Sequence, residues 1–437
     1  MAQKKPDLSI EFCGKKFMNP FLLSSSPVSN SASMVERAFD AGWGGVVFKT
    51  LGSDRLRIDH PSPRMNSMTV GTRKMATVQN VEQITDRPLK ENLMDLLYLR
   101  KHYPDHRIIH SIMGFADKEW EYLAKMSEDH GADMLELNFS CPNMTIEGSG
   151  DQAGKSFYDI EHYTSIVKKA VSIPVMAKMT PNITDMTETA MAAKNGGADA
   201  ISAINTVSGI TGIDLDSLVP QPNVFGRGAS SGTSGPGVKP IGLRFISDMA
   251  KDENLNLPLS GMGGIETWID ALQYLLVGAS TLQVTTGIMH YGYVIVQDMI
   301  EGLSDYMASR GIMKLEDLIG ATLPKLGKTE LFDLDRQGVV EYNLDKCVGC
   351  GQCLNVCTDA GGQALSWNAE KRRPEMNENK CLSCMLCSFV CPVSGLIKYK
   401  AMPEGWKRDE TIIRDPSLEK ELKYEPYVHD GDPGCLV

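Results

Sequence analysis

Eight cysteines near the C-terminal end constrain this chain more than any other feature of its sequence. They form the same spacing twice, with gaps of two, two and three residues between successive cysteines. The two runs are Cys347, Cys350, Cys353, Cys357 and Cys381, Cys384, Cys387, Cys391. Short gaps let three thiolates of one run converge on one face of a [4Fe–4S] cluster, while the fourth cysteine ligates the other cluster. The spacing therefore predicts two clusters, one on Cys347, Cys350, Cys353 and Cys391, the other on Cys357, Cys381, Cys384 and Cys387.

Structural zinc is the alternative interpretation of clustered cysteines, and the doubled run disfavours it. The first residues are basic, but no apolar segment follows them, and no apolar run in the chain is long enough to span a bilayer. Clustered cysteines in such a chain favour metal or redox chemistry over disulfides. The net charge of −11 argues against nucleic acid or an anionic membrane surface as the main partner. We expect a cytoplasmic protein.

Short β-branched runs alternate with amphipathic helical runs between residues 20 and 310. The predicted strands are 20–26, 45–50, 108–114, 134–140, 174–180, 200–208, 258–264 and 280–286. The predicted helices include 33–41, 117–129, 156–171, 185–195, 241–251, 266–277 and 291–310. Eight such units predict a closed (β/α)₈ TIM barrel. A doubly wound open sheet is the alternative, although no Gly-x-Gly-x-x-Gly follows the first strand.

The order of these features predicts the domain organisation. We expect a catalytic barrel over residues 1–311, a linker over 312–337, a ferredoxin-like domain over 338–400 and a charged tail over 401–437. Residues 51–88 and 209–240 do not fit the barrel repeat. Long loops are often binding loops, and both would lie at the C-terminal face of the barrel. Simple surface insertions are the alternative.

Polar residues and glycines stand at the C-terminal end of nearly every predicted strand, and in a barrel these ends converge on one pocket. Among them are Ser24, Lys49, Thr50, Asn138, Cys141, Lys178, Asn205, Thr206, Gly263, Gly264, Thr285 and Thr286. The glycine pair and the helix expected from residue 266, with the two threonines, suit a phosphate. Because the clusters carry single electrons and do no organic chemistry, the barrel should hold a two-electron centre, most simply a flavin.

Two lysines and one cysteine of this set carry the chemistry. Lys49 and Lys178 lie on interior strands, where an unpaired cation is costly, so we expect them beside the flavin N1/O2 edge. The alternative is that they are solvated rim residues. Cys141 precedes Pro142 and can move a proton at a substrate carbon. A buried structural cysteine is the alternative, and the neighbouring Asn138 and Ser140 favour catalysis.

Three motifs of the barrel resemble one known superfamily. Residues 138–142 (Asn-Phe-Ser-Cys-Pro), 177–182 (Ala-Lys-Met-Thr-Pro-Asn) and 205–209 (Asn-Thr-Val-Ser-Gly) are similar to the barrel motifs of the dihydroorotate and dihydropyrimidine dehydrogenases. The doubled cysteine run narrows the resemblance to dihydropyrimidine dehydrogenase. The order of parts is most similar to the separate catalytic subunit of the bacterial NAD-dependent enzymes. The resemblance covers the whole chain except the tail.

The resemblance implies roles for particular residues. It places FMN contacts at Ser24, Lys49, Thr50, Asn138, Lys178, Gly235, Gly263, Gly264, Thr285 and Thr286. It places pyrimidine contacts at Asn80, Glu82, Ile84, Asn138, Asn205 and Thr206. It makes Cys141 the catalytic acid. Residues 143–148 depart from the glycine-richer loop that the family has after this cysteine.

The resemblance also implies an activity and a partner. Uracil or thymine would be reduced reversibly to the 5,6-dihydropyrimidine in pyrimidine catabolism, with hydride from FMN N5 to C6 and a proton from Cys141 to C5. Electrons would come through the clusters from a partner subunit that holds FAD and an NAD(H) site, in a homo-oligomer or a hetero-tetramer. No NAD or FAD domain is recognisable in this chain.

Three other functions compete with this interpretation. A dihydroorotate dehydrogenase would bind a carboxylate, which Glu82 should repel. A tRNA dihydrouridine synthase shares the barrel and an Asn…Cys-Pro motif, but the negative net charge and the lack of a basic domain count against it. An electron-transfer protein without its own substrate would leave the polar strand ends unexplained.

Overall fold

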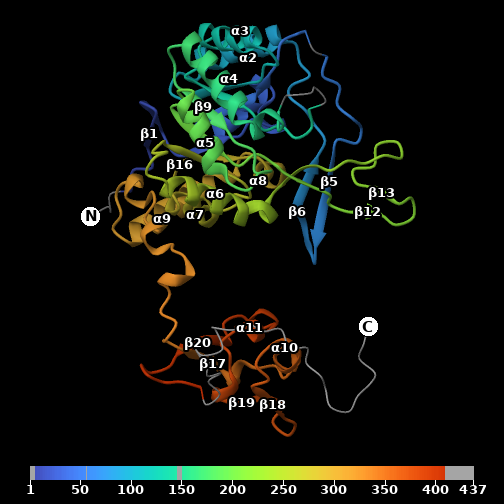
Figure 1. Cartoon of the computed structure of the whole chain (residues 1–437), viewed down its shortest axis with the longest axis vertical. Coiled ribbons are helices and arrows are strands. Elements are labelled where there is room, and N and C mark those ends of the chain that lie inside the picture. Colours follow the sequence, from blue (N-terminus) through green and yellow to red (C-terminus); the bar gives the residue numbers. More distant parts are fainter. Residues whose placement is uncertain (1–4, 56, 145–149, 409–437) are drawn as a thin grey trace, which may run out of the picture. The chain divides into compact units, whose positions relative to one another are not determined.

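The computed structural model describes residues 5–55, 57–144 and 150–408. Its contacts divide the chain into two compact units, Met1–Gly327 and Lys328–Val437 (Figure 1). Residues 145–149 after Cys141 lie outside the described residues, as does most of the predicted tail, including Cys435.

Eight parallel strands of the first unit close into a barrel, which confirms the predicted TIM fold and excludes the open sheet. Neighbouring strands follow one another along the chain. They are β3 (Phe21–Leu23), β4 (Gly45–Leu51), β7 (Arg107–Ile112), β8 (Met134–Asn138), β9 (Val175–Lys178), β10 (Ala200–Ala203), β15 (Leu259–Met262) and β16 (Ala279–Val284). Parallel strands direct all their C-terminal ends to one face, so residues far apart in sequence meet there.

Helices surround the barrel, and all of the following except α8 lie where a helix was predicted. They are α1 (Ala32–Ala41), α3 (Asp117–Asp129), α4 (Phe157–Ala170), α5 (Met186–Asn195), α6 (Lys239–Lys251), α7 (Trp268–Leu276), α8 (Thr286–Tyr291) and α9 (Ile295–Ser309). The sequence analysis did not predict α2 (Leu89–His102). Its buried Leu89, Leu93, Leu96 and Leu99 recur at helical spacing, so periodicity could have found it.

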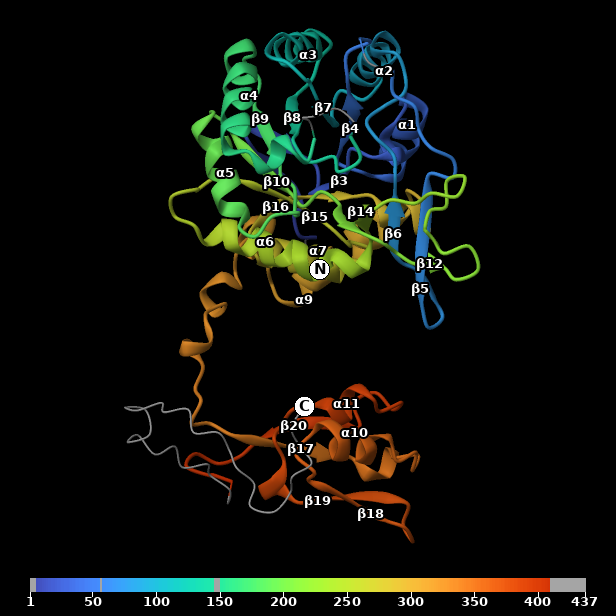
Figure 2. The same cartoon turned by 45° about the vertical axis from the view of Figure 1, so that its right-hand side comes forward.

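The two long insertions pair with each other, which sequence reasoning did not anticipate. The first forms the hairpin β5 (Met65–Val70) and β6 (Arg73–Asn80). The second contributes β14 (Ser231–Ser234), which pairs with β11 (Val207–Gly209) at the start of that insertion. The predicted sixth strand, 200–208, is therefore divided between the barrel strand β10 and β11, which lies outside the barrel. The four strands make one antiparallel sheet in the order β11–β14–β6–β5, and Figure 2 shows β14 beside β6. A short hairpin, β12 (Ile213–Asp214) with β13 (Val219–Pro220), extends from the second insertion.

The start of the segment expected to be a linker packs on the barrel unit. Leu315 and Leu318 are buried in the same core as the barrel helices. The backbone N–H of Gly320 donates to the carbonyl of Leu275 at 2.9 Å. Near the N-terminus, β1 (Ile10–Phe12) and β2 (Lys15–Phe17) form a separate hairpin.

The second unit is small and built around the cysteine runs. Strand β17 (Gly338–Tyr342) pairs antiparallel with β20 (Ile397–Ala401), and β18 (Leu365–Asn368) pairs with β19 (Arg373–Met376). Helix α10 (Gln352–Ala360) carries Cys353 and Cys357 of the first run, and α11 (Leu386–Phe389) carries Cys387 of the second. In the described part of the chain, no helix is long and apolar enough to cross a membrane.

Candidate active site

A cleft opens at the C-terminal ends of the barrel strands, as predicted. The space between its atoms amounts to about 1040 Å³, part of it open to solvent. The predicted contact residues all line it: Ser24, Lys49, Thr50, Asn80, Glu82, Ile84, Asn138, Cys141, Lys178, Asn205, Thr206, Gly235, Gly263, Gly264, Thr285 and Thr286. Their convergence is observed, and their individual roles remain predictions.

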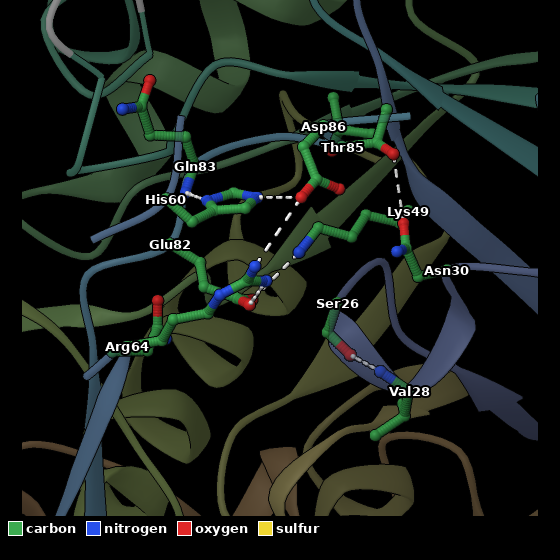
Figure 3. Close-up of polar contacts among 12 residues, drawn as sticks. Ser26, Val28, Asn30, Lys49, His60, Arg64, Glu82, Gln83, Thr85 and Asp86 are labelled. Atoms are coloured by element: carbon green, nitrogen blue, oxygen red, sulfur yellow. Dashed lines mark hydrogen bonds and ion pairs between the residues drawn. The ribbon is translucent and has the colours of Figure 1, made fainter. Parts of the chain in front are cut away.

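Lys49 enters this cleft from strand β4 as a buried cation. Its Nζ lies 2.9 Å from Oε2 of Glu82, and both side chains are about 6% exposed. Arg64 reaches the other carboxylate oxygen of Glu82, with Nη1 3.0 Å from Oε1 (Figure 3). Glu82 follows β6 and Arg64 precedes β5, so this cluster joins the hairpin insertion to the barrel.

The two cations decide the charge state of Glu82. Burial alone would raise the pKa of this carboxyl, but Lys49 and Arg64 outweigh it and hold the pKa below its ordinary value. Glu82 is therefore an ionised carboxylate whose charge is compensated. The expectation that it repels a substrate carboxylate loses its physical basis, because the cations beside it neutralise that field.

The cluster continues outward through Asp86 to His60 (Figure 3). Arg64 Nη2 and His60 Nε2 each lie 3.7 Å from Oδ2 of Asp86. The backbone N–H of Gln83 donates to His60 Nδ1 at 3.4 Å. Burial and the nearby Lys49 lower the pKa of His60, so its imidazole is neutral at pH 7. Sequence reasoning missed Arg64, His60 and Asp86, because their partners are distant in sequence.

Lys178 enters from β9 and is paired in the same manner. Its Nζ lies 3.4 Å from Oε1 of Glu136 on β8, and the two side chains are 3% and 0% exposed. The interpretation of both lysines as solvated rim residues is wrong, because each is buried against a carboxylate. Glu136 was not predicted, although it alternates with Asn138 and Ser140 and therefore shares their inward face.

A network of amide and hydroxyl groups holds the cleft beside Cys141. Asn138 donates through Nδ2 to Thr50 Oγ1 at 2.9 Å, and its Oδ1 accepts from the N–H and the hydroxyl of Ser140, both at 3.1 Å. Asn205 donates to Ser140 Oγ at 2.6 Å, and the N–H of Thr206 donates to Asn205 Oδ1 at 2.8 Å. Because each carboxamide is bonded on both sides, its orientation is fixed before a ligand arrives.

Cys141 follows β8 and lines the cleft. Burial raises the pKa of its thiol, although the backbone N–H of Asn143 and the charge of Lys49 act in the opposite direction. The thiol is therefore protonated at neutral pH. Its carbonyl accepts from the N–H of Asp151 at 3.0 Å.

Asn143 is a lining residue that sequence reasoning missed. Its Nδ2 donates to the carbonyl of Glu82 at 2.7 Å and to that of Asn80 at 3.1 Å. The contact ties the segment after Cys141 to the hairpin insertion. Other lining residues that were not predicted are Met65, Gln83, Thr233, Ser234, Met262, Gln283 and Met289.

Glycines crowd one end of the cleft where a phosphate was expected. Gly235, Gly263 and Gly264 all have positive φ, at 92°, 124° and 72°. A Cβ on Gly264 would lie 2.8 Å from the carbonyl oxygen of Gly235, so the two loops approach more closely than other residues allow. Ser234 and Thr286 hydroxyls, 2.9 Å apart, add donors. This cradle fits a phosphate-bearing cofactor.

The helix expected to face that phosphate differs from the prediction. Helix α7 begins at Trp268, and its first turn is capped by its own side chains: Thr267 Oγ1 accepts from the N–H of Asp270, and Asp270 accepts from the N–H groups of Glu266 and Thr267. A carboxylate at this end disfavours a dianion. The donors of the glycine loops and of Thr285 and Thr286 are the better match.

The second unit holds two apolar cavities, and each is lined by four cysteines. One is lined by Cys347, Cys350, Cys353 and Cys391. The other is lined by Cys357, Cys381, Cys384 and Cys387. These are the two ligand sets predicted from the spacing, with the fourth member of each exchanged between runs. Among the described residues, no three or more His, Cys, Asp or Glu side chains are grouped so that they could hold a single metal ion.

Comparison with known proteins places this architecture. Residues 7–307 match the Dihydroorotate dehydrogenase family and residues 341–399 match the 4Fe-4S dicluster domain. The NAD-dependent dihydropyrimidine dehydrogenase subunit PreA of Escherichia coli K12 is 50% identical over 401 residues, which cover 90% of this chain and 97% of the relative. This chain is a member of the dihydropyrimidine dehydrogenase family. It is an oxidoreductase of that type, with iron–sulfur and flavin cofactors and a role in pyrimidine redox chemistry.

Other relatives lie around this family. The chloroplastic dihydropyrimidine dehydrogenase (NADP(+)) of Arabidopsis thaliana is 36% identical, covering 79% of this chain and 84% of the relative. The catalytic subunit of dihydroorotate dehydrogenase B (NAD(+)) of Pyrococcus abyssi is also 36% identical, but covers 72% of this chain. A dihydroorotate dehydrogenase of Eimeria tenella, solved with ferulenol, superposes with a TM-score of 0.61 at 20% identity, covering 74% of this chain and 90% of that chain. This last likeness shows the shared fold.

Proposed function

We propose that this chain is the pyrimidine-reducing subunit of an NAD-dependent dihydropyrimidine dehydrogenase, acting reversibly on uracil or thymine. The observation that carries the proposal is the convergence of a protonated thiol, several carboxamides and two paired lysines on one cleft. The similarity to the subunit from Escherichia coli, which extends over both units, supports it.

The carboxamides suit an uncharged pyrimidine. Uracil alternates N–H donors and carbonyl acceptors around its ring, and carboxamides carry both kinds of group. Asn80, Asn138 and Asn205 all line the cleft. Asn138 and Asn205 are hydrogen-bonded on both sides and have little freedom to reorient, so they select a ring by the pattern of its polar edge.

The thiol of Cys141 is the proposed acid. Bound FMN supplies the hydride at C6 of the pyrimidine. Carbanion character then develops at C5, because the neighbouring C4 carbonyl withdraws charge. A thiol that burial keeps protonated can deliver its proton there. In the reverse direction the Cys141 thiolate takes this proton back.

The second unit is proposed to carry electrons to the barrel. Two [4Fe–4S] clusters, held by the two sets of four cysteines, supply single-electron transfer there. Apolar side chains around the thiols fit such clusters, because a low-dielectric shell sets their potential. We propose that a partner subunit with FAD and an NAD(H) site delivers these electrons.

One anaerobic experiment tests the proposal. The purified holoprotein is reduced with dithionite, excess reductant is removed, and uracil, thymine or orotate is added while flavin absorbance is followed. Reoxidation by uracil or thymine, with dihydropyrimidine formed, is expected. Reoxidation by orotate alone would establish a dihydroorotate dehydrogenase, and no reoxidation by any of them would contradict a pyrimidine substrate.

A further inference from the structure

A layer of polar side chains crosses the barrel interior beneath the cleft, where apolar packing is usual. Glu136, Ser202 and Ser260 are fully buried, and Gln283 is 1% exposed. They come from strands β8, β10, β15 and β16. Of these four residues, Gln283 is the one that lines the cleft, where Lys178 of β9 also stands. The other members of the layer therefore lie beneath two side chains that line the cleft, Lys178 and Gln283.

Glu136 contacts both of those side chains without lining the cleft itself. Its Oε2 accepts from Gln283 Nε2 at 2.9 Å and from Ser202 Oγ at 2.9 Å. Its Oε1 lies 3.4 Å from Lys178 Nζ. A buried carboxylate is costly unless it is paired and hydrogen-bonded. Here two of the partners, Lys178 and Gln283, line the cleft. The charge of Glu136 therefore determines which hydrogen-bonding groups these two side chains direct into the cleft.

The carboxylate decides which way the Gln283 amide faces. A glutamine amide can turn over without changing its shape, so its hydrogen-bond partners fix its orientation. A carboxylate only accepts, and Gln283 therefore directs Nε2 to Glu136, with Ser260 Oγ at 3.2 Å as a second acceptor. Oε1 is buried and has no hydrogen-bond partner among the described residues. An unsatisfied buried acceptor is costly until a ligand supplies a donor.

We propose that Glu136 is a positioning residue that makes Lys178 and Gln283 a matched donor and acceptor for the imide edge of the flavin. An imide carries N–H beside a carbonyl oxygen. Lys178 would donate to the oxygen, and Gln283 Oε1 would accept from the N–H. Glu136 would touch neither. This inference rests on the proposed FMN site and adds the residues that read one edge of the ring.

Binding of a modified flavin tests the inference without measuring turnover. The flavin is removed, and the protein is titrated with FMN or with N3-methyl-FMN, which lacks the imide N–H. Wild type should bind FMN about tenfold or more tightly than the analogue, because the analogue leaves Gln283 Oε1 buried and unpaired. In Glu136→Gln the neutral amide lets Gln283 turn over, and the preference should fall below about threefold.

Glu119→Gln is the matched control. Glu119 is a buried carboxylate of helix α3 that accepts from Ser53 Oγ at 2.6 Å and from the N–H of Phe115 at 3.0 Å, and it does not line the cleft. This variant should keep the full preference for FMN. A loss in both variants would indicate a general effect of removing a buried charge and would overturn the positioning role.

Further outcomes decide the remaining points. An unchanged preference in Glu136→Gln would overturn the inference. If that variant does not fold, Gln283→Met removes the acceptor itself, and an intact preference there would be equally decisive against it. Uracil carries the same imide edge, so rejection of 3-methyluracil with equal binding of both flavins would assign Gln283 to the substrate instead. A wild-type chain that takes up neither flavin would contradict the proposed function, which separates the two failures.

Discussion

The barrel and the second unit, which we call the cysteine unit, differ in how far each cofactor site is formed by protein contacts alone. In the barrel, side chains from different strands contact one another directly. Asn138 donates a hydrogen bond to Thr50, and Lys178 forms an ion pair with Glu136. In the cysteine unit, the buried core has few apolar side chains. Its buried members among the described residues are Val339, Val340, Ala364, Cys381, Cys387, Leu396 and Ile397. The barrel site is built before its ligand binds, whereas the cysteine unit needs its clusters as part of its interior.

Removing iron should give the largest difference between the two units. We expect about eight irons per chain by the two-cluster assignment. Without them, the cysteine unit should lose its ordered fold, because few buried apolar residues remain to stabilise it. Limited proteolysis of iron-free protein should cut within residues 328–408 and leave the barrel intact. If the iron-free cysteine unit resisted protease as well as the unit with its clusters, the claim that the clusters form part of its interior would be contradicted.

Replacing Cys141 should abolish chemistry without disturbing either unit. Cys141→Ala should keep FMN, iron and pyrimidine binding but lose about 10²–10⁴-fold in the rate of flavin reoxidation by uracil, as is typical when a general acid is removed. Stopped-flow absorbance measures this rate. Cys141→Ser should retain slightly more activity than the alanine variant.

Cys13→Ala is the control for this series, since Cys13 is a half-buried thiol outside the cleft that contacts the carbonyl of Asp199. It should react at the wild-type rate. Normal reoxidation in Cys141→Ala would exclude the thiol as the acid and direct attention to Ser140.

The pH dependence of the two directions should sharpen the same assignment. Burial raises the pKa of the Cys141 thiol above its ordinary value of 9.0. The reductive rate needs the protonated thiol, so it should stay flat through neutral pH and fall only above pH 9. The oxidative rate needs the thiolate, so it should rise up to tenfold per pH unit over the range below this pKa. Both limbs should disappear in Cys141→Ser, and an oxidative rate that is flat with pH would be inconsistent with a thiolate base.

The smallest expected effect concerns the glycine cradle. Gly264→Ala should weaken FMN binding about tenfold, because its Cβ would crowd the Gly235 carbonyl at 2.8 Å and force the loop away. Gly71→Ala is the control: Gly71 also has positive φ, 59°, but nothing lies within 4 Å of its added Cβ. It should carry the backbone strain, about 1 kcal/mol, without affecting FMN. Equal FMN affinities in the two variants would show that close approach is unimportant.

The sequence was most informative where chemistry repeats at a fixed spacing. The cysteine gaps predicted which four thiols share a cavity, and the strand periodicity brought Lys49, Asn138 and Lys178 to one face. Both predictions depend on local geometry, because a gap length or a strand end determines where a side chain lies.

The interaction partners of these residues could not be predicted from the sequence. Arg64 reaches Glu82 only because a hairpin folds back over the barrel, and that hairpin is held by pairing with a strand about 150 residues away. Pairing between distant insertions leaves no short-range pattern. Glu136 and Gln283 were readable in principle, since each alternates with polar residues on its strand, but their hydrogen bond depends on closure of the barrel.

The exchange of the fourth cysteine between the two cavities also bears on how the protein is made. Cys347, Cys350 and Cys353 leave the ribosome first, but the thiol that completes their cavity is Cys391, the last of the eight. The other cavity combines the early Cys357 with three late cysteines. Neither ligand set is complete until synthesis has passed the second run of cysteines. Neither cluster can therefore have all its ligands before the second run is made, and the thiols of the first run must be kept from oxidation until then.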